Sequence, residues 1–384
     1  MTDITNTTTH QPDQTIKNGS NKGKGLLKIV GTVAIVGTVA ALALFGISIN
    51  SQNGGLSDRM NLASKVNPEV ETAFNNFLAR HSKSFLTKEE FRARLSNFRN
   101  TFEEVKLHNS IQGSNFKMGL NQFSDWSQSE IDEMLQFKEP LDTDEDNTND
   151  EDLDQTLLKA DGDLLQAPAS IDWRAKGAVT PVLDQGRCSS CYTFSAAHAV
   201  EGAYQIKTGK LIEMSKQQLL ECSGRPYGNS GCRGGYMTNA YKYLKDNKLQ
   251  SDASYPYTGT AGTCKHDASK GITNVVSYTA LPANDPTALL NAVAKQPVSI
   301  AIYASSSALL AYKSGIVDTA KCGTNVNHAV TLVGYGSENG IDYWIIKNSW
   351  GAKWGEKGFI RIKRDMTKGP GICGIYKLSS IPTV

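Results

Sequence analysis

Apolar and polar residues are distributed differently in successive parts of the chain, and the first distinct part is an uncharged apolar run from Ile29 to Ile49. At about 1.5 Å per helical residue, this run is long enough to cross a hydrocarbon core of about 30 Å. Lysines precede it closely, and the first basic residue after it is Arg59. The positive-inside rule therefore predicts a cytosolic polar tail over residues 1–28 and a transmembrane signal anchor over residues 29–49. A cleaved signal peptide is the alternative, but its apolar core spans only about 7–15 residues.

The second part, residues 68–138, has a helical pattern. Residues three or four positions apart share one face of a helix. That face consists of Glu90, Arg94, Phe98, Thr101, Val105 and Asn109. Residues 119–125 follow as a short extended segment. Residues 139–166 then carry 11 acidic residues against Lys159 alone, which is typical of a solvated linker and indicates a domain boundary.

The third part, residues 167–384, begins with helices and ends with strands. Helical spacing of apolar residues starts near Cys191, and Ser215 and Asp285 each stand in a helix-start pattern. Strand-like apolar runs follow at residues 298–302, 329–333, 343–346 and 359–363. A helical part followed by a strand-rich part predicts an α+β fold with two lobes and a cleft between them.

Charge and cysteine content refine this picture. The net charge of +2 combines +10 over residues 167–384 with −8 over residues 1–166, so the two halves can attract each other and the total does not indicate nucleic-acid binding. All seven cysteines lie between Cys188 and Cys373, and an odd number leaves one thiol after pairing. A zinc site is the alternative, but nine residues separate Cys222 from Cys232, more than the two to four usual for a ligand pair.

Several motifs resemble those of one protein family. The run Asp184-Gln185-Gly186-Arg187-Cys188-Ser189-Ser190-Cys191-Tyr192 resembles the active-site signature of papain-like cysteine proteases. The further matching motifs are Asp172-Trp173-Arg174, Cys232-Arg233-Gly234-Gly235-Tyr236, Asn327-His328-Ala329, Gly334-Tyr335-Gly336 and Lys347-Asn348-Ser349-Trp350-Gly351. The helical face in residues 90–109, followed by Gly119, Asn121, Phe123 and Asp125, is similar to the propeptide of the cathepsin L-type branch, although Thr101 replaces a usual Asn.

This resemblance implies a papain-like peptidase domain over residues 167–384, an inhibitory propeptide domain over 68–138 and an acidic linker over 139–166. It implies that Cys191 is the nucleophile and His328 the general base and acid. Asn348 would orient His328, and the Gln185 side chain would form the oxyanion hole with the Cys191 backbone N–H. The implied disulfides are Cys188–Cys232, Cys222–Cys264 and Cys322–Cys373.

The resemblance also implies how a substrate binds. Gly234 and Gly235 would pair with an extended peptide, and Asn327 and Trp350 would line the same cleft. The S2 pocket would consist of Tyr236, Met237, Ala301, Val326, Ala329 and Leu378. Because this set is apolar apart from one hydroxyl, we expect a hydrophobic P2 residue.

Three residues of the signature depart from the usual family pattern. Arg187 replaces Ser, Ser189 replaces Gly, and Tyr192 replaces Trp. We expect Ser189 to narrow the P1 side of the cleft, or to strain the loop if that position requires a positive φ. His198, two turns after Cys191, is expected to be a packing or surface residue.

Together these features predict a cysteine endopeptidase that acts through a thioester acyl-enzyme and is made as an acid-activated zymogen. We expect a type II membrane precursor and, after processing, a lysosomal, vacuolar or secreted enzyme. The expected partners are protein and peptide substrates, the enzyme's own propeptide as intramolecular inhibitor, and the membrane through residues 29–49. No nucleic acid, cofactor or metal is expected, and the mature form is expected to be a monomer.

A catalytically silent papain-like binding or inhibitor protein is the alternative function. In that case the propeptide would be the functional, inhibitory domain of the chain. The presence of Cys191, His328, Asn348 and Gln185 argues against it, because such proteins commonly lack one of these residues.

Overall fold

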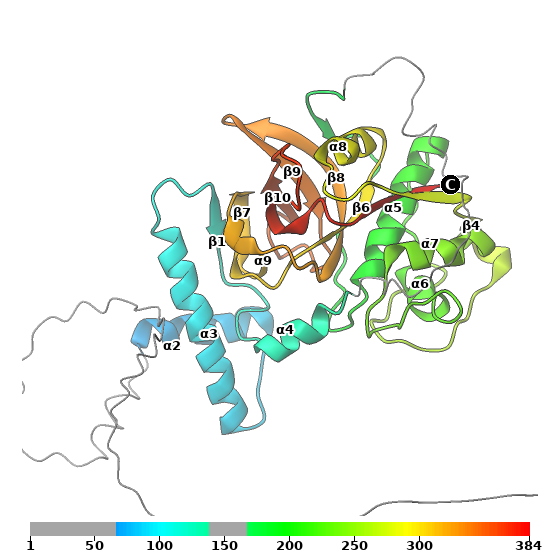
Figure 1. The fold of residues 1–384 in the computed structure, drawn as a ribbon. Coiled ribbons are helices and arrows are strands. Elements are labelled where there is room, and N and C mark those ends of the chain that lie inside the picture. Colours follow the sequence, from blue (N-terminus) through cyan, green and yellow to red (C-terminus); the bar gives the residue numbers. More distant parts are fainter. Residues whose placement is uncertain (1–66, 138–166) are drawn as a thin grey trace, which may run out of the picture. The chain divides into compact units, whose positions relative to one another are not determined.

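The computed structural model describes residues 67–137, here called the N-terminal region, and residues 167–384, here called the C-terminal region (Figure 1). The elements of the N-terminal region are α2 (Pro68–His81), α3 (Lys88–Asn109), β1 (Phe116–Met118) and α4 (Gln128–Met134). Helices α2 and α3 pack through a small core of Val70, Phe74, Phe77 and Phe98. The helical face predicted between residues 90 and 109 therefore lies within α3.

Residues 119–125 do not form the extended segment expected from the sequence. Asn121 Oδ1 accepts a hydrogen bond of 3.0 Å from the Phe123 backbone N–H, and Ser124 Oγ accepts one of 2.9 Å from the Asn121 N–H. Such local side-chain bonds favour a turn over a strand. The strand of this segment, β1, lies just before it.

The predicted membrane anchor is not supported. Among the helices of the two described regions, none is both long and apolar enough to cross a membrane. Helix α3 has the length, with 22 residues, but charged residues occur along all of it. Residues 1–28, 29–49 and 139–166 lie outside the described residues. The absence of a membrane-spanning helix among the described residues overturns the transmembrane, signal-anchor, membrane-partner and type II precursor predictions.

The C-terminal region contains both helices and strands. Its helices are α5 (Cys191–Thr208), α6 (Lys216–Cys222), α7 (Met237–Asp246), α8 (Pro286–Lys295) and α9 (Ser307–Leu310), with 3-10 turns η1 (Ala268–Lys270), η2 (Ala320–Cys322) and η3 (Ile372–Gly374). Gly209, with a φ of 74°, ends α5 because glycine adopts the left-handed conformation without a Cβ clash. The predicted caps are present: Ser215 Oγ accepts from the Gln218 N–H, and Asp285 accepts from Thr287 and Ala288.

Most strands belong to one sheet. The strands of the C-terminal region are β2 (Ile171–Asp172), β3 (Leu249–Gln250), β4 (Gly271–Thr273), β5 (Ser277–Ala280), β6 (Val298–Ile302), β7 (Tyr312–Val317), β8 (His328–Glu338), β9 (Ile341–Lys347), β10 (Phe359–Lys363) and β11 (Ser379–Thr383). The sheet has the order β1-β7-β10-β9-β8-β6-β11-β5, with β2 beside β8, while β3 and β4 pair separately. Strand β1 of the N-terminal region pairs antiparallel with β7, so both regions contribute to this sheet.

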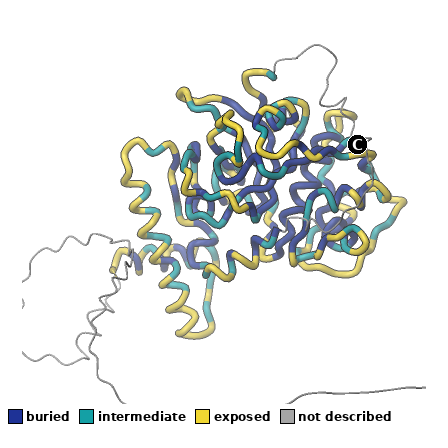
Figure 2. Tube along the Cα trace, viewed as in Figure 1, coloured by how far each residue is buried: buried dark blue, intermediate teal, exposed yellow. Residues whose placement is uncertain are grey.

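Two further hydrophobic cores lie mainly in the C-terminal region, one among the strands and one around α5, α6 and α7 (Figure 2). The N-terminal region adds side chains to both, for example Phe123 to the first and Phe137 to the second. Helix α5 is buried from Cys191 to Ala203 because it lies between the lobes. On one side Ser195 Oγ donates to the Val330 carbonyl of β8, and the Ser195 carbonyl accepts from Ser299 Oγ of β6. This arrangement places the start of α5 beside the start of β8.

Candidate active site

Six cysteines of the C-terminal region form disulfides. The pairs are Cys188–Cys232, Cys222–Cys264 and Cys322–Cys373, the same pairs that the resemblance implies. Cys191 is the remaining thiol and is buried. Because Cys188, Cys222 and Cys232 are oxidised, they have no thiolates with which to bind zinc.

Cys191 is the first residue of α5, where the helix dipole is positive. Backbone N–H groups of Ala329, Tyr192 and Cys191 itself act on the thiol and favour the thiolate. Burial outweighs them and raises the pKa of Cys191 to about 11. In this covered state the sulfur is therefore a neutral thiol.

His328 opens β8, directly before Ala329, and is fully buried. Its Nε2 donates a hydrogen bond of 2.8 Å to Asn348 Oδ1, which also accepts from the Ser349 backbone N–H. Since Asn348 Oδ1 is an acceptor in both bonds, the neutral ring carries its proton on Nε2 and leaves Nδ1 basic. His328 Nδ1 has no hydrogen-bond partner among the described residues. Burial lowers the pKa of His328 to about 4, and the Asn348 bond opposes this shift.

Trp350 covers the His328–Asn348 pair. Its ring stacks on the imidazole with a centroid distance of 4.9 Å and an interplanar angle of 26°. Trp350 is itself completely buried. The ring therefore excludes water from the hydrogen bond that orients His328.

Gln185 is held next to the same loop by a residue that sequence reasoning did not assign. Ser349 Oγ donates to Gln185 Oε1 at 2.6 Å, and the Gln185 N–H donates to the Ser349 carbonyl at 2.8 Å. The amide Nε2 of Gln185 then donates to the Cys188 carbonyl at 3.0 Å and, at 3.5 Å, to the carbonyl of Met134. The position of Ser349 between Asn348 and Trp350 in the sequence was the available signal.

The end of α4 and the residues after it occupy the cleft between the lobes. The Gln136 N–H donates to Ser189 Oγ at 2.9 Å, and the Phe137 N–H donates to the Asn327 carbonyl at 3.3 Å. A Cβ at Gly234, where φ is 91°, would lie 1.7 Å from the Gln136 carbonyl oxygen. Glycine at this position therefore allows the backbone of the N-terminal region to pass over the cleft.

Phe137 packs beside the apolar residues that the sequence assigned to P2 binding. Its ring lies 5.4 Å from that of Tyr236. All six predicted S2 residues belong to the cluster that contains Phe137: Met237, Ala301, Val326 and Ala329 are buried in it, and Tyr236 and Leu378 pack against it. Gly235 lies deeper, where a Cβ would come within 2.4 Å of Asn229 Oδ1.

The three departures from the family pattern are all accommodated. Ser189 is not among the residues with a positive φ, so the backbone strain considered from the sequence is absent there. Tyr192 is buried, and its hydroxyl donates to the Gly231 carbonyl at 3.3 Å. Arg187 forms an ion pair of 3.1 Å with Glu130 of the N-terminal region. His198 is a packing residue, as expected: it is buried and its Nδ1 contacts Thr331 Oγ1 at 3.3 Å.

A buried charge network that sequence reasoning did not identify supports the loop carrying Asn348. Glu201 of α5 pairs with Lys216 at 2.7 Å and accepts from Thr180 Oγ1 at 2.6 Å. Lys347, the residue before Asn348, donates to Thr180 Oγ1 at 2.8 Å. Burial lowers the pKa of Lys347 to about 7, with the Glu201 charge opposing the shift. The network links α5 to the end of β9, and thus the two sides of the site.

Comparisons with known proteins agree with this geometry. Residues 167–383 match the papain family cysteine protease domain, and residues 74–131 match the cathepsin propeptide inhibitor domain (I29). The chain is 37% identical to the probable cysteine protease RDL2 of Arabidopsis thaliana over 90% of this chain and 93% of that protein. It is 39% identical to papaya proteinase 4 of Carica papaya over 80% of this chain and 86% of that protein.

A solved structure gives the same result. Digestive procathepsin L 3 of the Tenebrio molitor larval midgut superposes with a TM-score of 0.71 at 33% identity, covering 83% of this chain and 100% of that one. This chain therefore belongs to the papain family of cysteine proteases. It is a cysteine endopeptidase in its zymogen form, with a papain-like two-lobe fold preceded by a helical propeptide.

Proposed function

We propose that Cys191 and His328 carry out the peptide hydrolysis, with Asn348 and Gln185 as their supporting residues. One observation carries this assignment: the unpaired thiol at the start of α5 interacts with the backbone N–H of Ala329, directly after His328. This contact supports a nucleophile on one lobe that acts with a base on the other. The His328–Asn348 bond leaves Nδ1 as the nitrogen available to the thiol.

The reaction would proceed in two halves. His328 Nδ1 takes the thiol proton, and the Cys191 sulfur attacks the scissile carbonyl carbon. The Gln185 amide and the Cys191 N–H stabilise the resulting oxyanion. Its collapse breaks the C–N bond while His328 protonates the leaving amine, which leaves a thioester. His328 then deprotonates a water molecule that attacks the thioester, and the acid and the free thiolate are released.

Latency has a steric and an electrostatic component in this proposal. Residues 134–137 of the propeptide cover the cleft, and the burial that accompanies them favours the neutral thiol and the neutral imidazole. When the propeptide leaves, water reaches both groups, and the penalty on their charged forms decreases. Activation then restores the thiolate that the reaction requires.

The direct test compares the purified full chain with its Cys191→Ala and Gln185→Ala variants at about pH 4.5 in mild reductant. Mass spectrometry follows propeptide cleavage, and a fluorogenic peptide with Leu at P2 follows turnover. We expect Cys191→Ala to remove both, and Gln185→Ala to lower turnover by about 10²–10³-fold. Unchanged processing and turnover in Cys191→Ala would refute the assignment.

A hydrophobic P2 preference follows from the pocket that Phe137 occupies. Leu378 lines that pocket, and replacing it by Glu would place a carboxylate in an otherwise apolar site. We expect Leu378→Glu to accept Arg at P2 and the uncharged Leu378→Gln control to reject it. Rejection of Arg by both variants would remove Leu378 from the pocket.

A further inference from the structure

Arg187 lies in the loop between Gln185 and Cys191. The ion pair and the ring contact described for its side chain are both with the propeptide. Arg187 forms its ion pair of 3.1 Å with Glu130, and its guanidinium carbon lies 5.0 Å from the ring centroid of Trp126. The ion pairs described within residues 167–384 do not include Arg187. Both partners are lost when the propeptide is removed.

The path of the propeptide shows at which end of the cleft Arg187 lies. Phe137 occupies the S2 pocket, Gln136 lies at Ser189, and the Met134 carbonyl lies at Gln185. Continuing in the same direction leads along α4 to Glu130 and Arg187. Arg187 is thus on the far side of the oxyanion-hole residue from S2, where the residues after the scissile bond bind.

The distance identifies the substrate position. Glu130 and Met134 are four residues apart in α4, which corresponds to about 6 Å along a helix. An extended substrate covers this distance with about two residues. A scissile carbonyl placed where the Met134 carbonyl now lies would therefore bring the P2′ residue to Arg187.

We propose that Arg187 is a specificity-determining residue that selects substrates with an acidic side chain at P2′. This inference rests on the function proposed above and adds a substrate class to it. Glu130 is the present occupant of this position, and its ion pair with Arg187 shows that a carboxylate can reach the guanidinium there. The guanidinium fork suits a carboxylate, and the Arg187 side chain is 67% exposed even beneath the propeptide.

The expected effect is moderate because the site is exposed. Exposed ion pairs contribute up to about 1 kcal/mol, which corresponds to about a fivefold preference. The preference requires an ionised substrate carboxylate, so it should decrease as the pH falls through about 4.3. It should also decrease in 1 M salt, where the Debye length is about 3 Å.

The experiment uses the processed enzyme and quenched fluorescent peptides that differ only in Glu, Gln or Lys at P2′. We expect kcat/KM for Glu to exceed that for Gln by about 3–5-fold in the parent enzyme at pH 5.5 and low salt. Arg187→Ser should bring the Glu-to-Gln ratio to about one. Arg233→Ser, which removes an exposed arginine whose backbone pairs with Ser189, should leave the ratio unchanged.

The neutral Gln peptide separates this inference from the proposed function. If Arg187→Ser and the parent both cleave it and neither distinguishes Glu from Gln at P2′, the role of Arg187 is refuted and the catalytic assignment stands. A ratio that persists in Arg187→Ser would likewise refute it. If the Gln peptide is cleaved equally well by Cys191→Ala, the catalytic assignment fails and this inference fails with it.

Discussion

The propeptide and the peptidase domain are stabilised in different ways. Helices α2 and α3 of the propeptide share a core with four fully buried apolar side chains. The peptidase domain has two larger cores, and all three disulfides of the described residues lie within it. The exposed end of α3 and the adjoining loop, where Leu86 is 99% exposed, add little burial to the propeptide.

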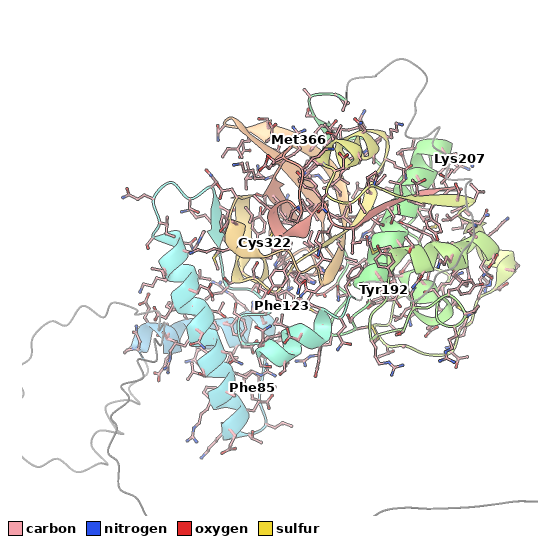
Figure 3. All side chains as sticks on the ribbon, viewed as in Figure 1. Phe85, Phe123, Tyr192, Lys207, Cys322 and Met366 are labelled. Atoms are coloured by element: carbon pink, nitrogen blue, oxygen red, sulfur yellow. A yellow bond between two sulfur atoms is a disulfide. The ribbon has the colours of Figure 1, made fainter. Side chains whose placement is uncertain are left out.

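This difference indicates that the propeptide unfolds more easily than the peptidase domain. A domain with a small core and no cross-link is close to the limit of independent stability. The propeptide contacts the enzyme through the β1–β7 pairing, an ion pair, hydrogen bonds and side-chain packing, and none of these contacts is covalent. One example is the edge-to-face pair of Phe123, labelled in Figure 3, and Trp350 at 5.0 Å. The inhibitor can therefore unfold under conditions that the enzyme survives.

Removing the centre of the propeptide core should have the largest effect. Phe98→Ala deletes a completely buried ring that contacts Phe74 and Phe77, at a cost of about 3–5 kcal/mol. We expect such a variant to process itself at neutral pH, as measured by mass spectrometry over time. Leu86→Ala, at the 99% exposed position, is the matched control and should behave as the parent.

Opening a disulfide should instead destabilise the peptidase domain. The Cys322–Cys373 pair closes a loop with a sequence separation of 51, and its loss should destabilise the peptidase domain by about 2–5 kcal/mol. Cys322→Ser with Cys373→Ser should lower the thermal midpoint of the processed enzyme. Retention of the parent midpoint would contradict the claim that cross-links account for the difference between the two domains.

Glu130 forms an ion pair between the two domains. It pairs with Arg94 at 2.8 Å and with Arg187 at 3.1 Å, and its pKa is lowered to about 2 because the hydrogen bonds and charges, chiefly from Arg94, outweigh burial. Because the pKa is depressed, its contribution is complete above about pH 4.5 and is lost only as the pH falls through about 2. Glu130→Gln should weaken docking by about 1–3 kcal/mol and speed processing at every pH from 5 to 7 by a similar factor. If the pH dependence of processing were instead steeper or shifted in Glu130→Gln, protonation of Glu130 would be the step that starts acid activation.

His81 should produce the smallest effect, one confined to mildly acidic pH. It lines a cavity of about 450 Å³ between the domains, together with Asp184 and Lys353. Burial lowers its pKa, the Lys83, Lys353 and Arg80 charges lower it further, and the Asp125 charge opposes them. A depressed pKa means that docking loses stability as the pH falls below about 6.5. His81→Gln should therefore move the midpoint of self-processing to lower pH, and an unchanged midpoint would contradict this role.

Sequence patterns predicted the helices, the strands and the two lobes well. The caps at Ser215 and Asp285 and the four apolar runs after residue 297 correspond to the observed elements, since capping and strand periodicity are local properties. The turn at Asn121 was missed because its side-chain bonds replace the extended backbone. The membrane prediction rested on the hydropathy of a segment that lies outside the described residues.

Motifs predicted the proposed site residues, but they did not predict the residues that support them. Ser349 and the Glu201–Lys216 pair act through contacts between residues distant in sequence, such as the bond from Ser349 to Gln185. No local periodicity encodes such contacts. The roles of Arg187 and Ser189 toward the propeptide also required the path of residues 130–137 through the cleft.

The pairing of β1 with β7 has a consequence for the processed enzyme. While the propeptide is attached, Phe116, Lys117 and Met118 lie opposite Gly315, Ser314 and Tyr312, so β7 is an interior strand of the sheet. Proteolysis that removes β1 turns β7 into an edge, with backbone groups free to bind another extended chain. Lys313, exposed on this strand, is the kind of charged residue that discourages such pairing. The propeptide thus covers a sheet edge that its release exposes, and Lys313 is the charged residue that remains on that strand.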